Sequence, residues 1–302
     1  MRILPLHLQQ NILNMKSFFL AALSIATVGF TGTTQAQGSG KLVIANKAKY
    51  ALTNVVKSTT NMEMMGQSMD IIADMTMFYN LDVTDVQPNK ITVDASLIGM
   101  KMNTSAMGQN MTFDSDKKED LDGDIGKAVA GEFNKVTTVE FNDNAQVLST
   151  KKEAAKESAE GAEAGMSMIK NMGSMADDGT NGASMAFLVI PSGIIVGNSW
   201  ADSSVKEELK IYRNYTLTAL NGNEATVTLT GKQNTHRKTE QNGMEFEVNM
   251  ESKMTGNITL DISTGIIKQK TISMDGTGAT EVMGQSMPMT TKVTITTTVA
   301  PK

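Results

Sequence analysis

The chain has no cysteine in its 302 residues and only two histidines, His7 and His236. The lack of cysteine excludes disulfide bonds, thiolate metal sites, cysteine nucleophiles and the lipid attachment that anchors bacterial lipoproteins. A serine triad, a histidine-based zinc site and most general-base schemes need more partners than one histidine at position 236 supplies. We therefore predict a protein that is not an enzyme and that uses no cofactor.

Long apolar runs are also lacking. The longest, residues 18–30, is shorter than the roughly 20 residues that a transmembrane helix needs. It follows Lys16 and precedes small and polar residues that end at Ala36, which is the order of a secretory signal peptide. We expect residues 1–36 to be removed near Ala36, with Met1 or Met15 as the start codon. The predicted product is exported, periplasmic or secreted, soluble and without a transmembrane span.

Basic residues are few and scattered. The chain has 27 Lys and Arg against 32 Asp and Glu, and loss of Arg2 and Lys16 with residues 1–36 would change its net charge from -5 to -7. An acidic chain without a basic run is a poor partner for nucleic acid or for anionic headgroups. We therefore predict no nucleic-acid partner.

The main signal in the chain is alternation of apolar and polar residues with a period of two, which places alternate side chains on one face of a strand. The clearest segments are residues 71–83, 244–254 and 287–299. In residues 91–102 the apolar phase changes beside Gly99, which predicts a bulge or bend there. The predicted fold is mainly β (α+β): a large curved antiparallel sheet or half-barrel built from hairpins, with one or two helices packed on it.

Turn signals separate the alternating segments, at Pro88-Asn89, Asn221-Gly222, Asn242-Gly243 and Ser263-Thr264-Gly265. A pattern Met-Gly-Gln-x-Met occurs three times, beginning at Met65, Met107 and Met283. Each copy lies where one alternating segment gives way to another. We interpret the pattern as a repeated hairpin turn.

Two segments favour helices. Residues 151–176 are rich in Ala, Glu, Lys and Met, with Thr150 and Glu153 as a capping box and small apolar residues at three and four spacing. A weaker helix is predicted over residues 125–133, with a short hairpin over residues 136–148 between the two. The predicted organisation is a signal peptide, 1–36, and a single β-rich domain, 37–302, with a helical insert at about 151–176.

Three other patterns invite a chemical interpretation that their details do not support. His236 lies in a polar segment and is expected to be exposed at a hairpin end. The segment from Gly197 to Ala201 lacks the second glycine of a nucleophile elbow and the helix that must follow. The acidic run from Asp114 to Asp124 lacks the EF-hand glycine and glutamate, so a solvated acidic turn is expected, with nonspecific Ca²⁺ binding as the alternative.

Methionine is abundant, with 24 residues, whereas aromatic residues make up 5% of the chain. Flexible thioethers fill irregular apolar spaces, and they are also soft ligands for Cu(I). Most of the methionines are in phase with aliphatic residues on strand faces, which favours a core or the lining of a cavity. The predicted lining of an apolar ligand site is Met75, Met77, Met100, Met102, Met250 and Met289. The alternative Cu(I) ligands are Met62, Met64, Met65 and Met69, or Met283 and Met287 with Met289.

These observations leave three functions open. A methionine-lined sheet face, partly closed by the predicted helix, would admit an apolar small molecule or a lipid of the cell envelope. A closed core would instead indicate a structural or interaction protein with an envelope protein as its partner. Methionine-based Cu(I) binding is the third hypothesis. The first two differ in whether the space between sheet and helix is open or filled.

The segment from Pro191 to Trp200, ending Val196-Gly197-Asn198-Ser199-Trp200, and the segment Asp261 to Ile266 resemble an uncharacterised family of exported β-rich proteins, common in Bacteroidota-like bacteria. The resemblance implies export and a β-rich fold, and it implies no activity or site residue. The strand-helix-strand order is also similar to the half-barrel of periplasmic lipoprotein carriers. That likeness is one of architecture only.

Overall fold

The computed structural model describes residues 40–64, 67–106, 108–153, 180–206, 208–241, 244–282 and 284–302. The predicted signal peptide, residues 1–36, lies outside the described residues. So does the predicted helical insert from residue 154 onward.

Twelve strands are described, together with four short helical segments. The strands are β1 (Lys49–Met64), β2 (Gln67–Gln87), β3 (Lys90–Ala106), β4 (Gln109–Asp114), β5 (Val136–Phe141), β6 (Val147–Lys152), β7 (Ser199–Val205), β8 (Leu209–Asn221), β9 (Glu224–Gln241), β10 (Met244–Asp261), β11 (Ile266–Val282) and β12 (Gln285–Pro301). The helices are α1 (Lys118–Asp122) and α2 (Asp124–Val129), and the 3-10 turns are η1 (Ala130–Glu132) and η2 (Ala183–Met185).

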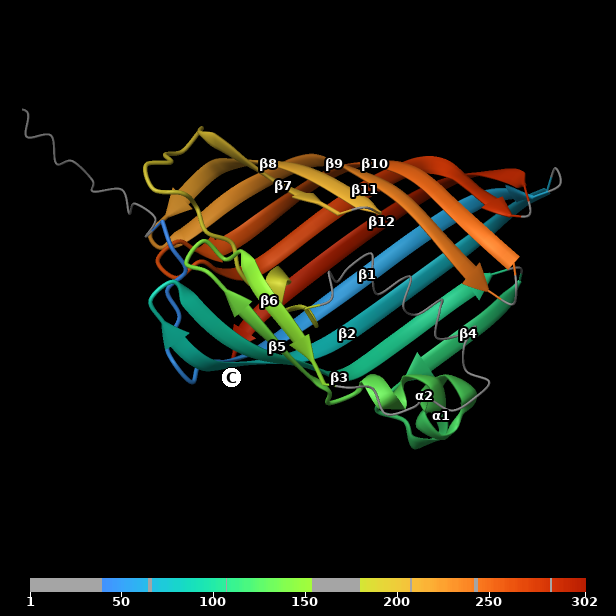
Figure 1. The fold of residues 1–302 in the computed structure, drawn as a ribbon, viewed down its shortest axis with the longest axis horizontal. Helices are drawn as coiled ribbons and strands as arrows, with labels where there is room; N and C mark the ends of the chain where they lie inside the picture. The colour runs from blue at the N-terminus through green and yellow to red at the C-terminus, as the bar shows by residue number, and fades with distance from the viewer. Residues whose placement is uncertain are drawn as a thin grey trace, which may run out of the picture. The chain divides into compact units, whose positions relative to one another are not determined.

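All twelve strands form one antiparallel sheet, with the order β6-β5-β3-β2-β1-β12-β11-β10-β9-β8-β7, and β4 pairs with the remaining length of β3. Figure 1 shows this sheet as a curved layer of long strands. Within the described residues its outermost strands are β6 and β7, so the sheet is open. The predicted fold class is confirmed. At the centre of the sheet, the first strand, β1, pairs with the last, β12, from Tyr50↔Pro301 to Met62↔Met289.

The long strands alternate between a buried and a wetter side, as their sequences predict. On β2 every second residue from Ala73 to Val83 is buried, and the residues between them are not. We call the sheet face that carries these buried side chains the inner face. On β3 the inner-face phase changes because Ile98 is an extra residue, since Phe78 pairs with Gly99 and Tyr79 pairs with Leu97. This bulge confirms the one predicted beside Gly99.

Hairpins join neighbouring strands as predicted. The turns at residues 88–89, 222–223 and 262–265 have positive φ at Asn89, Gly222 and Gly265. The three Met-Gly-Gln-x-Met copies lie between the paired strands β1 and β2, β3 and β4, and β11 and β12. Gly108 and Gly284 supply the positive φ in two of them, so the turn interpretation is confirmed for these two copies. Residues 65–66 of the first copy lie outside the described residues. The Asn242-Gly243 turn lies outside the described residues.

The predicted helix over residues 125–133 is confirmed by α2 and η1. The hairpin predicted over residues 136–148 is confirmed by β5 and β6. The predicted start of the helical insert at residue 151 is wrong, because β6 continues to Lys152 and pairs Thr150 with Val139. The proposed capping box fails for the same reason: cross-strand pairing holds Thr150 extended.

Two segments outside the sheet cover one part of its inner face, residues 40–48 and 180–190, here called the covering segments. Leu42, Ile44, Ala186 and Phe187 belong to the same buried cluster as the sheet residues. Backbone bonds fix both segments to the sheet: Val43 N donates to Thr264 O, and Ile267 N donates to Ala186 O. Phe187 also packs edge-on against Phe141 of β5, at a centroid distance of 5.4 Å.

In the part of the chain that the structure describes, no helix has both the length and the apolarity required to cross a membrane.

Candidate functional site

Cross-strand register divides the inner face into rows, because directly paired residues of neighbouring strands point to the same side. One row is apolar across ten strands and is here called the apolar row. Its members are Phe113, Met102, Met75, Val56, Ile295, Ile272, Gly256, Leu229, Tyr215 and Trp200. The inner-face side chains from this row to the covering segments are mostly buried. We call this part the closed half.

Beyond the apolar row, toward the Met-Gly turns, the inner face mixes buried side chains, among them Thr291, Ser252 and Met250, with partly exposed ones. We call this part the open half. It includes a polar row of Ile71, Thr60, Thr291, Gly276, Ser252 and Gln233. Next to it lies a methionine row of Met69, Met62, Met289, Gly278 and Met250. Met62, Met69 and Met289 are only partly buried, whereas Met250 is 9% exposed. Partly exposed apolar side chains therefore lie beyond the polar row.

All six residues predicted to line a ligand site lie on the inner face. Met75, Met77, Met100 and Met102 are 1–5% exposed and belong to the packed core. They form one group, because Met75 pairs with Met102 and Met77 pairs with Met100. The other two predicted residues, Met250 and Met289, lie apart from that group in the methionine row of the open half.

The predicted Cu(I) ligands come from both sides of the β1–β12 junction. Met62 pairs directly with Met69 on β2 and with Met289 on β12. Met287 lies on the same face, two residues from Met289, and pairs with Thr280 of β11. The side chains of Met64, Met65 and Met283 lie outside the described residues. Register therefore unites the two predicted sets, which lie more than two hundred positions apart in the sequence.

His236 is exposed as predicted, but it lies within β9 rather than at a hairpin end. Its Nδ1 atom is 2.5 Å from Asn249 Oδ1 and 3.6 Å from Glu247 Oε1. Hydrogen bonds from Lys238 and Asn249 lower the pKa of Glu247. A hollow of about 430 Å³ includes His236, Asn249, Met250 and Glu251 in its lining. Nothing in this set pairs the histidine with a nucleophile.

The acidic run is a local hydrogen-bonded turn that leads into α1. Asp114 Oδ1 accepts from the Asp116 backbone N–H, and Asp120 Oδ2 accepts from the Asp114 backbone N–H. The Asp116 bond, with Lys101 beside it, lowers the pKa of Asp114. Among the described residues, no three His, Cys, Asp or Glu side chains converge as metal ligands. Ser199 begins strand β7 and not a helix. The segment therefore lacks the helix that follows a nucleophile elbow, as predicted.

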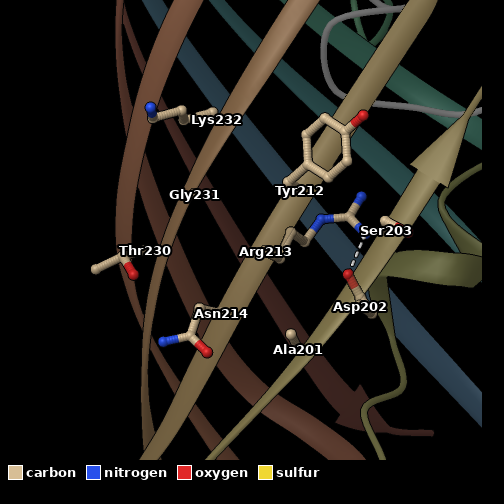
Figure 2. Close-up of a pocket in the computed structure, with 9 residues that line it drawn as sticks. All are labelled: Ala201, Asp202, Ser203, Tyr212, Arg213, Asn214, Thr230, Gly231 and Lys232. Carbon is tan, nitrogen blue, oxygen red and sulfur yellow. Dashed lines mark hydrogen bonds and ion pairs between the residues drawn. The ribbon is translucent and has the colours of Figure 1, made fainter.

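A hollow of about 630 Å³ lies over β7, β8 and β9 (Figure 2). Arg213 Nη1 is 3.0 Å from Asp202 Oδ1, and the Tyr215 hydroxyl donates to Asp202 Oδ2 at 3.2 Å. The Tyr215 ring stacks on Trp200 at 5.3 Å, and burial raises the pKa of the Tyr215 hydroxyl. The paired Arg213 guanidinium and Asp202 carboxylate are able to hydrogen-bond a polar group of a ligand.

Gly231 is required beside this hollow, because an added Cβ would lie 2.4 Å from Tyr212 O and 2.9 Å from Met254 Cγ. Sequence reasoning did not single out Arg213, Asp202 or Tyr215. The sequence did contain one signal. Arg213 is in phase with the inner-face residues Ile211 and Tyr215, so a charged residue stands at a position where the alternation predicts an apolar one.

Asn54 is a buried polar residue of β1, with 0% exposure. Its Oδ1 atom accepts a hydrogen bond from Thr297 Oγ1 at 3.1 Å. Its Nδ2 atom has no hydrogen-bond partner among the described residues. Such a group costs about 1–3 kcal/mol, so the inner face carries a donor able to bind a water or a polar ligand atom.

The chain has distant similarity to several solved structures. A structure of lipid–protein interactions in lipovitellin is 10% identical over 85% of this chain, with a TM-score of 0.48, and the match spans only 25% of the lipovitellin chain. An outer-membrane channel of Pseudomonas putida F1 is 8% identical over 87% of this chain and 98% of its own, with a TM-score of 0.25. The translocator domain of the Neisseria meningitidis autotransporter NalP is 6% identical over 85% and 90%, with a TM-score of 0.20. All three scores are too low to imply a shared function.

No protein with a curated description matches the sequence. A family model does match, over residues 88–267, which is more than half of the chain. The matched range runs from the β2–β3 turn to the start of β11 and contains both segments that carried the predicted resemblance to an uncharacterised family. The chain belongs to the family of unknown function DUF6263.

Proposed function

We propose that this protein is an exported, non-enzymatic binding protein that holds an apolar ligand of the cell envelope, such as a lipid, against the open half of its inner face. The observation that carries the proposal is the continuation of apolar side chains beyond the covered core. Met62, Met69 and Met289, with Phe246 and Val248 on β10, are only partly buried. Apolar surface left unburied on one continuous face is typical of a ligand or partner site.

An acyl chain would gain by covering this surface. Burial is worth about 0.8 kcal/mol for each CH₂ group, and ordering of the chain offsets part of that gain. Methionine suits such a surface because its unbranched, polarizable side chain adapts to ligands of different shape. In this proposal Met250 and Met289 contact the ligand, and Met75, Met77, Met100 and Met102 form the packed floor that holds the sheet in shape.

Native mass spectrometry of protein purified from its own envelope fraction tests the proposal, followed by solvent extraction of bound material. We expect a reproducible extra mass that extracts as a lipid. Met289→Asp should lose it, because an anion would replace an apolar wall. Thr290→Asp is the matched control, since Thr290 is the exposed neighbour on the other face of β12. An apo mass from gently handled wild-type protein would contradict the proposal.

Export is tested separately by fractionating the cells and sequencing the N-terminus of the purified protein. We expect the mature chain to begin at Gln37, after the small-residue segment that ends at Ala36. An intact N-terminus in cytoplasmic material would contradict this part of the proposal and leave the ligand experiment unaffected.

A second candidate function is that of an envelope scaffold with a closed core. Exposed aliphatic side chains at both sides of the open sheet favour it: Val147 and Leu148 on β6, Val205 on β7, and Ile195 and Val196 before β7. Unpaired strand edges with apolar residues attract partner chains. A clean apo mass, together with an envelope protein cross-linked through β6 or β7, would support this function over ligand carriage.

A further inference from the structure

We propose that Met62, Met69 and Met289 form a solvent-accessible thioether site for Cu(I). The same three side chains belong to the surface proposed for the apolar ligand, but Cu(I) binding depends on their sulfur atoms and not on apolar area. The observation behind it is the register of the central strands: Met62 of β1 is the direct partner of Met69 on β2 and of Met289 on β12.

The spacing of the three side chains suits one ion. Directly paired residues in an antiparallel sheet have Cβ atoms about 4.5–5.5 Å apart and point to the same face. Met62 therefore lies between two methionines at that spacing. Each thioether reaches its sulfur through three rotatable bonds, which lets three sulfurs from adjacent strands converge above the sheet.

The ligand chemistry selects Cu(I). Thioethers are soft, neutral ligands that favour Cu(I) over harder divalent ions. The neighbouring oxygen and nitrogen ligands, which suit harder ions, point to the opposite face of the sheet. There Asn61 Nδ2 donates a hydrogen bond to Asp70 Oδ1 at 2.7 Å. The nearest hydroxyls of the polar row, Thr60 and Thr291, bond each other at 3.0 Å. A zinc or calcium ion would find no charged ligand within the row.

Exposure separates these methionines from those of the core. Met75 and Met102 also pair directly, but they are 1% and 5% exposed and packed among aliphatic side chains. Met62, Met69 and Met289 are partly exposed, so an ion can reach their sulfurs. Met289 Sδ accepts a hydrogen bond from Thr280 Oγ1 of β11 at 3.3 Å, so binding of a shared ion would require this side chain to turn from β11 toward Met62.

Gly278 places no side chain in the row beyond Met289. It is the β11 partner of Met289 and of Met250 on β10. An added Cβ there would lie 2.0 Å from Asn249 O, so the position has no room for a side chain. Met287, next along β12 on the same face, is available as a further thioether.

The test is anaerobic titration of the full-length protein with Cu(I) against the chromogenic chelator bicinchoninate. We expect the wild-type protein to take one equivalent and X-ray absorption to show sulfur as its ligands. The variant M62L/M69L/M289L should lose the ion to the chelator while keeping its circular dichroism spectrum, because leucine matches methionine in size and apolarity. Uptake unchanged in this variant would overturn the site.

Met111→Leu is the matched control. Met111 occupies the last position of the second Met-Gly-Gln-x-Met copy, as Met69 and Met287 do in the others, and it is 39% exposed on β4. It pairs with Thr104 and has no methionine partner across the strand. The control should bind Cu(I) as the wild type does, and equal loss would overturn the site by showing that the loss is not specific to Met62, Met69 and Met289. Two separate measurements on the wild-type protein distinguish failure of this inference from failure of the proposed function: Cu(I) uptake by titration, and bound lipid by native mass spectrometry.

Discussion

The closed and open halves of the inner face lie on the same strands and share the same alternation, yet they differ in what covers them. On β1, Leu52 and Val56 are each 1% exposed, whereas Met62, on the same face, is partly exposed. The closed half lies under the covering segments, to which backbone hydrogen bonds attach it. Alternation thus specifies which side chains share a face, and a separate part of the chain decides whether that face becomes core or surface.

A charge introduced in each half gives the largest contrast. Met75→Asp places a carboxylate at a 1% exposed position on β2, and an unpaired buried charge costs several kcal/mol out of a total stability of about 5–15 kcal/mol. We expect this variant to be unfolded or nearly so. Met69→Asp, on the same strand and face, should fold. Urea titration followed by the fluorescence of Trp200 distinguishes them, and equal stability of the two variants would remove the distinction between the halves.

Truncation gives the next largest difference. Leu52→Ala should lower the free energy of unfolding by about 2–5 kcal/mol, because it leaves a cavity in the packed core. Met62→Ala, ten residues along the same strand, should cost less than about 1 kcal/mol, because water already reaches that position. Midpoints of chemical denaturation measure both. A loss at Met62 as large as that at Leu52 would show that the open half is packed in solution.

The backbone of the open half is tested by Gly278→Ala. The new methyl group would approach Asn249 O at 2.0 Å, so β10 and β11 must shift, at a cost of about 1–3 kcal/mol. The control Thr277→Ala, at the adjacent exposed position, should change stability by no more than about 0.5 kcal/mol. If both variants match the wild type in thermal unfolding, the close approach of the strands at this position is absent.

The smallest effect concerns the turn that ends β10 beside the closed half. Burial raises the pKa of Asp261, but hydrogen bonds from Ser263 and Thr264 outweigh it and hold the pKa below its ordinary value of 3.8. Because the folded-state pKa is depressed, the stabilisation is present above the ordinary pKa and is lost as the pH falls through the folded-state value. Asp261→Ala should cost about 1 kcal/mol at neutral pH, a figure reduced for exposure to solvent.

Asp261→Asn separates charge from hydrogen bonding in this turn. Its amide oxygen can still accept from the Ser263 and Thr264 backbone N–H groups, so most of the stability at neutral pH should remain. The dependence on pH below 3.8 should shrink, as measured by unfolding between acidic and neutral pH. If the stability of this variant falls with pH below 3.8 as steeply as that of the wild type, Asp261 is not the group that causes the fall.

Local patterns predicted much of the fold, since alternation and turn chemistry act over a few residues. They located the hairpins at Asn89, Gly222 and Gly265 and the bulge beside Gly99. They failed at Thr150, where helix-like composition was overridden by pairing with β5. They placed His236 at a hairpin end, whereas it lies within β9, because a polar strand face and a turn have similar composition.

The candidate site was predicted only in part, because it depends on register between distant strands. The six lining methionines were assigned to the correct face, since phase alone decides that. Whether Met75 is packed and Met289 partly exposed depends on the covering segments, whose position leaves no periodic signal. The meeting of Met62 with Met289 follows from the β1–β12 pairing, which no local pattern encodes.

The pairing of β1 with β12 also determines when the sheet can be completed during folding. Each half of the chain can form its hairpins early, but the central ladder must wait until strands at opposite ends of the sequence find each other, which makes folding slow. Lys302 N donates to Lys49 O at 3.0 Å, so these two points of the chain lie side by side. A circular permutant that links Lys302 to Gly40, so that the covering segment 40–48 is kept, and that opens between β6 and β7 would make β12 and β1 consecutive in the chain. Apart from β4, the order of strands along the chain would then follow their order in the sheet.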